Sequence, residues 1–272
     1  MLEKNEQVFA GNVEDLIEKS WKKGRNNMLV QFLQEKGSLQ NAMEVFPGVK
    51  EAFEHPLDTV DCSDGRVNGG GRKIGVAGSG MLLTENDRKL FIEWAKGKAK
   101  VLTTHDDCGA AKAKFATLSL EDIPEGIKTA DEYGRYCGEK TAKEIGAKHN
   151  HLNRDEMASS NHNEVGLTID QTGRFNSDGL EGFPPHFVCT GAGIGFSEEY
   201  VKNEVHMLTG IALGHHGFGE RFDEENPFII MVAANNLEEL LKWKGIAEET
   251  LAEYGNRVRV DGFVRPDSAE KN

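Results

Sequence analysis

Two short segments of the chain carry residues that can bind a metal ion. Cys62 lies in the segment Asp-Cys-Ser-Asp-Gly-Arg-Val, and His105 and Cys108 lie in the segment Thr-His-Asp-Asp-Cys-Gly. His105 and Cys108 are three positions apart, so one short turn can present both to the same ion. Two thiolates and an imidazole suit zinc, and three protein ligands leave a fourth position for water, as in catalytic zinc sites. The residue types therefore predict a zinc site made of Cys62, His105 and Cys108.

A charged pair follows the first cysteine. Asp64 and Arg66 are two positions apart, and in an extended loop such residues point the same way. They can form a charge-assisted pair beside the metal, in which the carboxylate accepts a hydrogen bond from bound water. If Arg66 releases it, Asp64 can instead swing onto the metal. The structural alternative is that the cysteines are small buried apolar residues and that the ion pair is a solvated surface pair of little consequence.

The elements that must position these residues are predicted to be the strand ends of an α/β fold. Short apolar runs predict strands at residues 57–62, 73–76, 100–104, 186–190, 228–234 and 257–264. Longer patterns predict helices at residues 84–96, 110–117, 129–147, 197–213 and 237–254. This alternation predicts a mainly parallel central sheet flanked by helices. Loops that leave the carboxyl ends of neighbouring parallel strands face one crevice, so Cys62 and His105 can meet there.

The chain is predicted to form one α/β domain, with residues 1–55 as an N-terminal helical arm and residues 56–272 as the catalytic core. Gly24 and Gly37 are expected to break the arm into two or three helices, which pack on their own domain or on a partner subunit. Residues 148–183 are polar and rich in Asn, and we expect them to be irregular apart from a short strand at 165–169 or to cover a site. No internal repeat is visible.

The composition excludes several classes of function. The chain has 32 Lys and Arg against 45 Asp and Glu, a net charge of −13, so it lacks the basic surface that nucleic acid or an anionic membrane would need. Four cysteines in 272 residues are too few for a disulfide scaffold. Cys137 is expected to pack in a helix, whereas Cys189 ends a predicted strand and can reach the crevice. With no long apolar run and no apolar leader, we expect a cytoplasmic protein, or an organelle stromal protein after processing.

A family resemblance is carried by two motifs, Cys62-Ser63-Asp64-x-Arg66-Val67 and His105-x-x-Cys108-Gly109. Together with the small-residue segment 74–80 between them, they resemble the β-class carbonic anhydrases over residues 58–116. The chain departs from that family in a shorter Cys-to-His interval and a long tail. Segments 109–111 and 214–217, rich in Gly, Ala and His, are similar to the subgroup of the algal limiting-CO2-inducible protein B, which is related to the θ class.

The resemblance implies a zinc enzyme that reversibly hydrates carbon dioxide to bicarbonate. Zinc would bind Cys62, His105 and Cys108, and Asp64 with Arg66 would form the catalytic dyad. The residues that would approach the substrate are small, and they are Gly78, Ser79, Gly80 and Gly109. The resemblance and the helical arm also imply a homo-oligomer, a dimer or higher.

Two further functions stay open at this stage. The same zinc site can hydrolyse carbonyl sulfide or carbon disulfide, with the pocket deciding between the gases. Alternatively, the chain is a zinc-bearing homolog without activity that serves in assembly or sensing. The intact pair of Asp64 and Arg66 favours an enzyme. His215 or His216 is a candidate proton carrier, because histidine exchanges protons near neutral pH.

Overall fold

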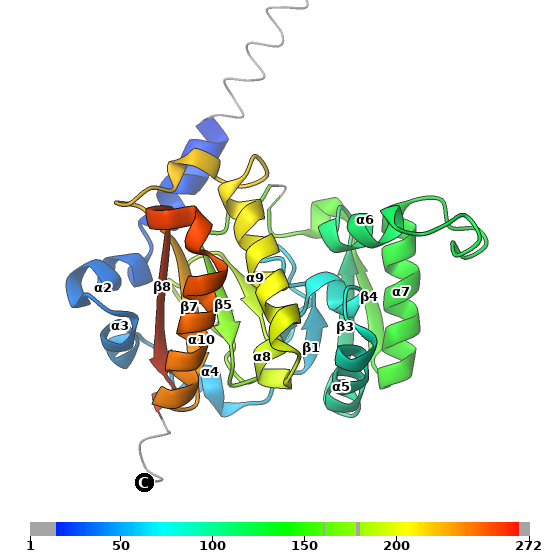
Figure 1. The fold of residues 1–272 in the computed structure, drawn as a ribbon, viewed down its shortest axis with the longest axis horizontal. Helices are drawn as coiled ribbons and strands as arrows, with labels where there is room; N and C mark the ends of the chain where they lie inside the picture. Colours follow the sequence, from blue (N-terminus) through cyan, green and yellow to red (C-terminus); the bar gives the residue numbers. More distant parts are fainter. Residues whose placement is uncertain (1–14, 160, 178–179, 267–272) are drawn as a thin grey trace, which may run out of the picture.

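The computed structural model describes residues 15–159, 161–177 and 180–266, and it has an α/β architecture (Figure 1). Within these residues, eight strands form two four-stranded sheets whose strand pairings are all parallel. Helices flank the sheets, and a helical region precedes the first strand. The predicted fold class is therefore confirmed. The part of the arm prediction that concerns residues 1–14 lies outside the described residues.

The first sheet has the strand order β2-β1-β3-β4. Its strands are β1 (Thr59–Asp61), β2 (Lys73–Gly75), β3 (Val101–His105) and β4 (Lys148–Leu152). Its connections contain the 3-10 turn η1 (Ala77–Gly80) and the helices α5 (Glu85–Ala95), α6 (Gly109–Ala116) and α7 (Ala130–Ile145). Thr84 caps α5, and Thr129 forms a capping box with Glu132 at the start of α7, so two predicted helix starts are confirmed.

The second sheet has the strand order β6-β5-β7-β8, which repeats the order of the first sheet strand for strand. Its strands are β5 (Gly166–Asp170), β6 (His186–Cys189), β7 (Phe228–Ala234) and β8 (Val258–Val264). Its connections contain the helices α8 (Gly191–Ile194), α9 (Glu198–Leu213) and α10 (Leu237–Thr250). The fold thus holds a repeat that the sequence does not display.

The two sheets meet along strands β2 and β6. The backbone N–H of Val188 donates to the carbonyl oxygen of Ser63 at 3.0 Å, and that of Thr190 donates to the carbonyl oxygen of Gly75 at 2.9 Å. A side-chain contact also joins helices of the two halves. Asp87 of α5 accepts hydrogen bonds from the backbone N–H and the hydroxyl of Ser197, which caps α9. The loops after β1 therefore lie next to the second sheet.

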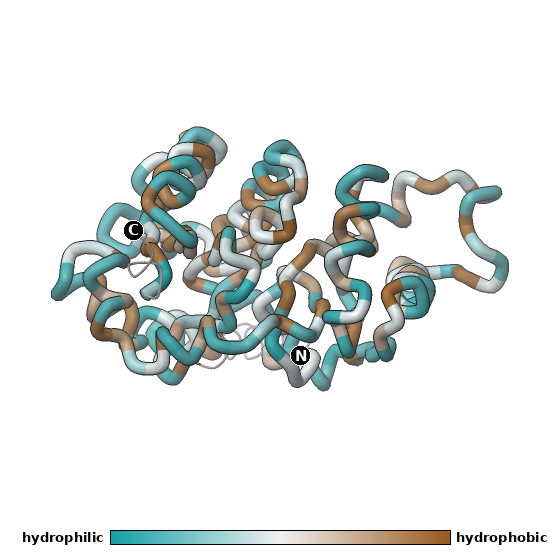
Figure 2. The backbone as a smooth tube through the Cα atoms, turned by 90° about the horizontal axis from the view of Figure 1, so that it is seen from below, coloured by the Kyte–Doolittle hydropathy of each residue, from teal (hydrophilic) through white to brown (hydrophobic). Residues whose placement is uncertain are grey.

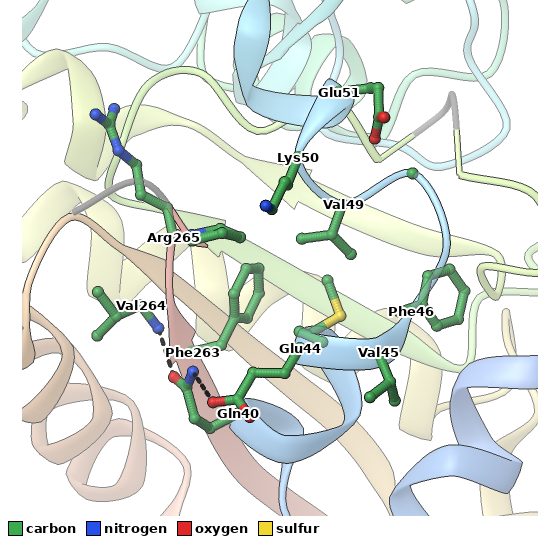
Figure 3. Close-up of a pocket in the computed structure, with 13 residues that line it drawn as sticks. Gln40, Glu44, Val45, Phe46, Val49, Lys50, Glu51, Phe263, Val264 and Arg265 are labelled. Atoms are coloured by element: carbon green, nitrogen blue, oxygen red, sulfur yellow. Dashed lines mark hydrogen bonds between the residues drawn. The ribbon is translucent and has the colours of Figure 1, made fainter. Parts of the chain in front are cut away.

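Three helices of the arm, α2 (Met28–Lys36), α3 (Leu39–Val45) and α4 (Glu51–Glu54), cover one face of the second sheet. The first helix of the arm, residues 15–25, packs through Ile17 and Trp21 with the other core cluster. Along β7, Ile229, Met231 and Ala233 pack with the arm, while the alternate residues pack with the core beneath α9 and α10. In α3, the Gln40 side chain accepts from the Val264 N–H at 2.9 Å, beside a cavity of about 530 Å3 that holds none of the predicted metal ligands (Figure 3).

Several predicted boundaries need correction. Gly37 ends α2 in a left-handed conformation, as predicted, but Gly24 lies inside the helix of residues 15–25 and packs on Val165. The chain breaks instead at Asn27, which caps α2. Residues 148–152 form strand β4 and are not irregular, whereas the strand expected at 165–169 is observed as β5.

One segment extends away from the rest of the fold. It connects α6 to α7, and Figure 2 shows it reaching outward at one end of the molecule. Leu120 at this loop is 92 % exposed. Among the described helices, none has both the length and the apolar character that a bilayer crossing requires.

Candidate metal centre

The three predicted metal ligands converge at the carboxyl ends of two neighbouring strands. Cys62 follows β1, His105 is the last residue of β3, and Cys108 caps the start of α6. Strands β1 and β3 are parallel neighbours, so their ends point into the same crevice. The ligand atoms of the three residues all lie within 4.8 Å of one another, and all three residues are buried. The predicted grouping is present.

The imidazole of His105 is oriented as a metal ligand requires. Its Nδ1 lies 2.8 Å from the carbonyl oxygen of Asp106, so the Nδ1–H donates there and leaves Nε2 with a lone pair. Nε2 is buried and has no hydrogen-bond partner among the described residues. A buried polar atom without a partner is costly, and a cation between this nitrogen and the two sulfurs would satisfy it. The residues present therefore fit a metal ion.

The two thiols share their protons unequally. The Cys108 thiol and the His105 imidazole lower the pKa of Cys62 well below its usual range, against the opposing effect of burial. The Cys62 sulfur also accepts the backbone N–H of Gly78 at 3.3 Å. The neighbouring Cys62 sulfur and burial raise the pKa of Cys108 well above its usual range. A divalent cation between the two sulfurs would favour loss of the thiol protons.

The predicted dyad is a buried pair with several contacts. The Arg66 backbone N–H donates to Asp64 Oδ1 at 2.9 Å, and its guanidinium donates to Oδ1 at 3.0 Å and to Oδ2 at 2.6 Å. Both side chains are 8 % exposed. Although burial opposes ionisation, the Arg66 contacts hold the pKa of the Asp64 carboxyl well below its usual range. The pair is thus a fixed part of the site, which excludes the alternative of a solvated surface pair.

A buried lysine holds the loop that carries the dyad. Lys73 of β2 is 3 % exposed, and its Nζ donates to the carbonyl oxygens of Asp64 at 2.8 Å and Val67 at 3.0 Å. Because both acceptors flank Arg66, this cation fixes the loop from within.

The centre opens into a cavity of about 380 Å3 built by both halves of the chain. The first half supplies Cys62, Asp64 and Arg66, whereas an apolar wall comes from the second half and consists of Phe187, Met207, Leu208 and Ile211. The charged residues at the cavity are paired with one another, because Arg66 contacts Asp64, and Asp107 forms ion pairs with Lys112 at 2.8 Å and with Arg154 at 2.5 Å. A neutral substrate can therefore reach the ligands along an apolar surface.

The small residues predicted near the substrate have different positions. Gly78 and Gly109 line the cavity. Ser79 is buried and donates its hydroxyl to the carbonyl oxygen of Thr103 at 2.5 Å, and a side chain at Gly80 would meet the Phe91 ring at 3.2 Å. Residues 78–80 all have positive φ angles, so they form a tight turn that aims the Gly78 N–H at Cys62. Ser79 and Gly80 therefore shape this turn and do not line the cavity.

Two residues of the site escaped sequence reasoning. His162 and Glu164 follow β4 in the polar segment and lie beside the dyad, and their ligand atoms and that of Asp64 are within 4.8 Å of one another. Their spacing of two residues in an extended loop, the same signal as in Asp64-x-Arg66, was available in the sequence. Cys189, which could have been a fourth ligand, is fully buried in the apolar core and is not part of the Cys-His-Cys group.

Comparison of the chain with protein-family models, with curated proteins and with solved structures finds no match. The function must therefore be argued from the chemistry of the centre. A Cys-His-Cys set with one open side suits a metal that prefers nitrogen and sulfur ligands and keeps a position for water.

Proposed function

We propose that the protein is a zinc-dependent carbonic anhydrase of the β-class superfamily, which hydrates carbon dioxide to bicarbonate. The observation that carries the proposal is the convergence of Cys62, His105 and Cys108 next to a buried carboxylate that Arg66 holds in one orientation. The family resemblance of the two motifs and the parallel strand ends that carry them support it. The preference for zinc follows from the two sulfur donors and one nitrogen donor.

When bound, zinc would lower the pKa of a water ligand to near neutrality and so supply a nucleophile. The residues of the chain orient the reaction. Asp64 presents a carboxylate oxygen that can accept a hydrogen bond from the attacking water, and Arg66 fixes this oxygen by donating from Nε and Nη2. Gly78 fixes the Cys62 sulfur through its N–H.

The cavity walls suit a small apolar substrate and a charged product. Phe187, Met207 and Leu208 exclude water from the side that faces the ligands. Arg66 lies in the same cavity and offers a positive charge to the bicarbonate that forms. The net charge of −13 is no obstacle, because a neutral gas needs no electrostatic steering.

A stopped-flow assay with a pH indicator tests the proposal. We expect the zinc-loaded protein to hydrate carbon dioxide, and Asp64→Asn to lower kcat/KM by about a hundredfold or more, in line with loss of a positioned hydrogen-bond acceptor for the attacking water. Asp122→Asn, a change in the exposed loop between α6 and α7, is the matched control and should leave kcat/KM unchanged.

The same assay separates the competing functions. Turnover of carbonyl sulfide without turnover of carbon dioxide would replace the proposal by the hydrolase hypothesis, since both gases fit the cavity. If the zinc-loaded protein acts on neither gas, the enzymatic proposal is wrong and the hypothesis of an inactive zinc-bearing homolog is favoured.

A further inference from the structure

The metal cavity shares a wall with a second cavity. The second cavity has a volume of about 420 Å3 and lies between the helix of residues 15–25 and the segments 161–163 and 215–218. The residues that line both cavities are Asn161, His162 and His216. Histidine side chains therefore form part of the boundary between the metal centre and another opening in the fold.

His162 is held in this wall by carboxylates. Its Nδ1 lies 3.1 Å from Oε2 of Glu164 and 3.9 Å from Oδ1 of Asp64, and the Glu164 side chain is 1 % exposed. The ring also packs on Phe187, with the two ring centres 5.6 Å apart. Because an ionised carboxylate only accepts hydrogen bonds, the Nδ1–H donates to Glu164 and Nε2 is the basic nitrogen. The hydrogen bond to Glu164 and the contact with Phe187 therefore hold the ring in one orientation.

The carboxylates that line the metal cavity are poor proton acceptors. Both oxygens of Asp64 accept hydrogen bonds from Arg66, and Asp107 forms ion pairs with Lys112 and Arg154. Both carboxylates are therefore already engaged by cations. Histidine is the side-chain type that exchanges protons most readily in this range, and His162 is the cavity histidine in contact with Glu164 and the dyad.

The proposed hydration releases one proton for each bicarbonate formed, and this proton must leave a buried centre. We propose that His162 carries that proton from the metal cavity to the second cavity and that Glu164 positions its ring. This inference rests on the proposed function. An O–H bond of the reacting water breaks, its electron pair stays on oxygen, and the proton forms an N–H bond at Nε2 of His162. The imidazolium then gives a proton to a buffer base in the second cavity, which restores the neutral ring.

Steady-state kinetics of zinc-loaded His162→Ala test the transfer. Proton release follows the formation of bicarbonate. A variant with slow proton transfer should therefore have a lower kcat but an unchanged kcat/KM. We expect kcat in weak buffer to fall about tenfold or more, kcat/KM to stay within about twofold, and added imidazole to restore kcat. His206→Ala is the matched control, because His206 also contacts a carboxylate, that of Glu253 at 2.5 Å, but on the exposed outer side of α9.

A second readout does not depend on turnover. In 15N NMR spectra of the zinc-loaded protein, the imidazole signals that vanish in His162→Ala identify this ring. We expect the neutral ring to carry its proton on Nδ1 and to bind a second proton at Nε2 as the pH falls. A neutral ring protonated at Nε2 would overturn the proposal.

The outcomes distinguish this inference from the proposed function. An active wild type with unchanged kcat in His162→Ala refutes proton transfer by His162 alone, and so does an equal fall in kcat and kcat/KM. A wild type without activity refutes the proposed function itself. Equal zinc content and equal melting temperatures in wild type and His162→Ala are required before the kinetic comparison is made, and His162→Gln replaces His162→Ala if the latter does not fold.

Discussion

Individual side chains decide whether a metal binds, and the cysteines of this chain illustrate the difference. Cys62 and Cys108 are buried and face the orphaned Nε2 of His105. Cys137 lies in α7 at intermediate burial, and burial raises its pKa, so it remains a protonated thiol near neutral pH. The residue type alone does not distinguish a metal-binding cysteine from a packing cysteine, but the neighbouring side chains do.

Replacement of a ligand should therefore remove the metal selectively. We expect Cys62→Ser to reduce bound zinc from about one ion per chain to less than about a tenth, because two ligands do not hold the ion tightly. Atomic absorption after gel filtration measures this, and Cys137→Ser is the matched control. A chelator should lower the melting temperature of the wild type but not of Cys62→Ser, since only the former loses a stabilising ligand. Full zinc occupancy in Cys62→Ser would contradict the assigned site.

The buried lysine should matter for stability as well as for the dyad. Lys73→Met removes the donor to the Val67 carbonyl oxygen and leaves the Asp64 carbonyl oxygen with the Val67 N–H alone, and we expect it to lower the free energy of unfolding by about 2 kcal/mol or more. Lys100→Met is the control, because the Lys100 side chain is 77 % exposed and its ion pair with Asp58 should be worth less than about 1 kcal/mol. Urea unfolding measures both. Equal losses in the free energy of unfolding in the two variants would show that the buried hydrogen bonds of Lys73 stabilise the fold no more than an exposed ion pair does.

At the scale of elements, α9 is tied to the metal loops by one buried acid. The Glu204 Oε1 atom accepts the Ser63 hydroxyl at 2.5 Å and the Ala77 N–H at 2.6 Å, so it contacts both loops that flank Cys62. Burial raises the pKa of Glu204 to about 8, and the two hydrogen bonds only partly offset this effect. The acid is therefore neutral over most of the physiological pH range.

This raised pKa predicts a pH dependence of stability with a definite sign. Between about pH 4.5 and about pH 8 the folded chain keeps the Glu204 proton that the unfolded chain has lost, so stability falls as pH rises through this range. Glu204→Gln keeps the shape of the neutral acid and removes its titration. We expect the free energy of unfolding of the variant to match the wild type near pH 5 and to exceed it by about 4 kcal/mol near pH 9. Parallel pH profiles of the two proteins in urea unfolding would contradict this.

The elements also show why some of the fold could be predicted and some could not. Strand β7 has seven buried apolar residues in sequence, and the caps Thr84 and Thr129 mark two helix starts, so these elements are visible in the sequence. Strand β4 reads Lys-His-Asn-His-Leu and lies at a sheet edge, where no apolar pattern is needed. Its histidines contact Thr104, a partner distant in sequence, so the strand is specified by pairing with β3.

The candidate site follows the same division. Cys62, His105 and Cys108 could be predicted because Cys62 and His105 lie at the ends of recognisable strands, which converge, and Cys108 follows His105 within one turn. The apolar wall could not, because it depends on the docking of the second sheet, which no local pattern reports. The Ser63 carbonyl that receives the Val188 N–H is one residue from a ligand, yet the sequence does not reveal that pairing.

For the whole molecule, the repeated strand order gives the two halves different roles. Asp61 pairs with Gly75 shortly before η1, and in the second half Ile169 pairs with Cys189 shortly before α8, so Ile169 corresponds to Asp61. The next residue, Asp170, therefore corresponds to Cys62. Asp170 accepts the backbone N–H groups of residues 172, 173 and 175 and so builds a turn. Ala234 stands at the place of His105 and offers no ligand atom. The first half therefore holds the ligands and the second half supplies the wall.

The line where the halves meet should be sensitive to a single methyl group. A side chain at Gly75 would overlap the carbonyl oxygen of Val188, so Gly75→Ala must push β2 and β6 apart. We expect a loss of about 2 kcal/mol or more in the free energy of unfolding, together with weaker zinc binding. Gly245→Ala is the control, because a side chain there meets open space on α10 and should stabilise the chain by about 0.5–1 kcal/mol. Unchanged stability in Gly75→Ala would show that the contact between the sheets is dispensable.

A site built from two halves of one chain needs no second copy to be complete. The ligands come from β1, β3 and α6, and the facing wall comes from β6 and α9, all within one protomer. The predicted homo-oligomer would then add stability or regulation without adding a wall to the cavity.

We expect zinc content and carbon dioxide turnover per chain to stay constant when any oligomer dissociates on dilution. Analytical ultracentrifugation at matched concentrations monitors the dissociation. If turnover falls in proportion to dissociation, a partner contributes to the site and the two halves are not sufficient. Constant turnover in the dissociated chain would show that the second half of the chain completes the wall of the cavity, so that no neighbouring subunit is needed for it.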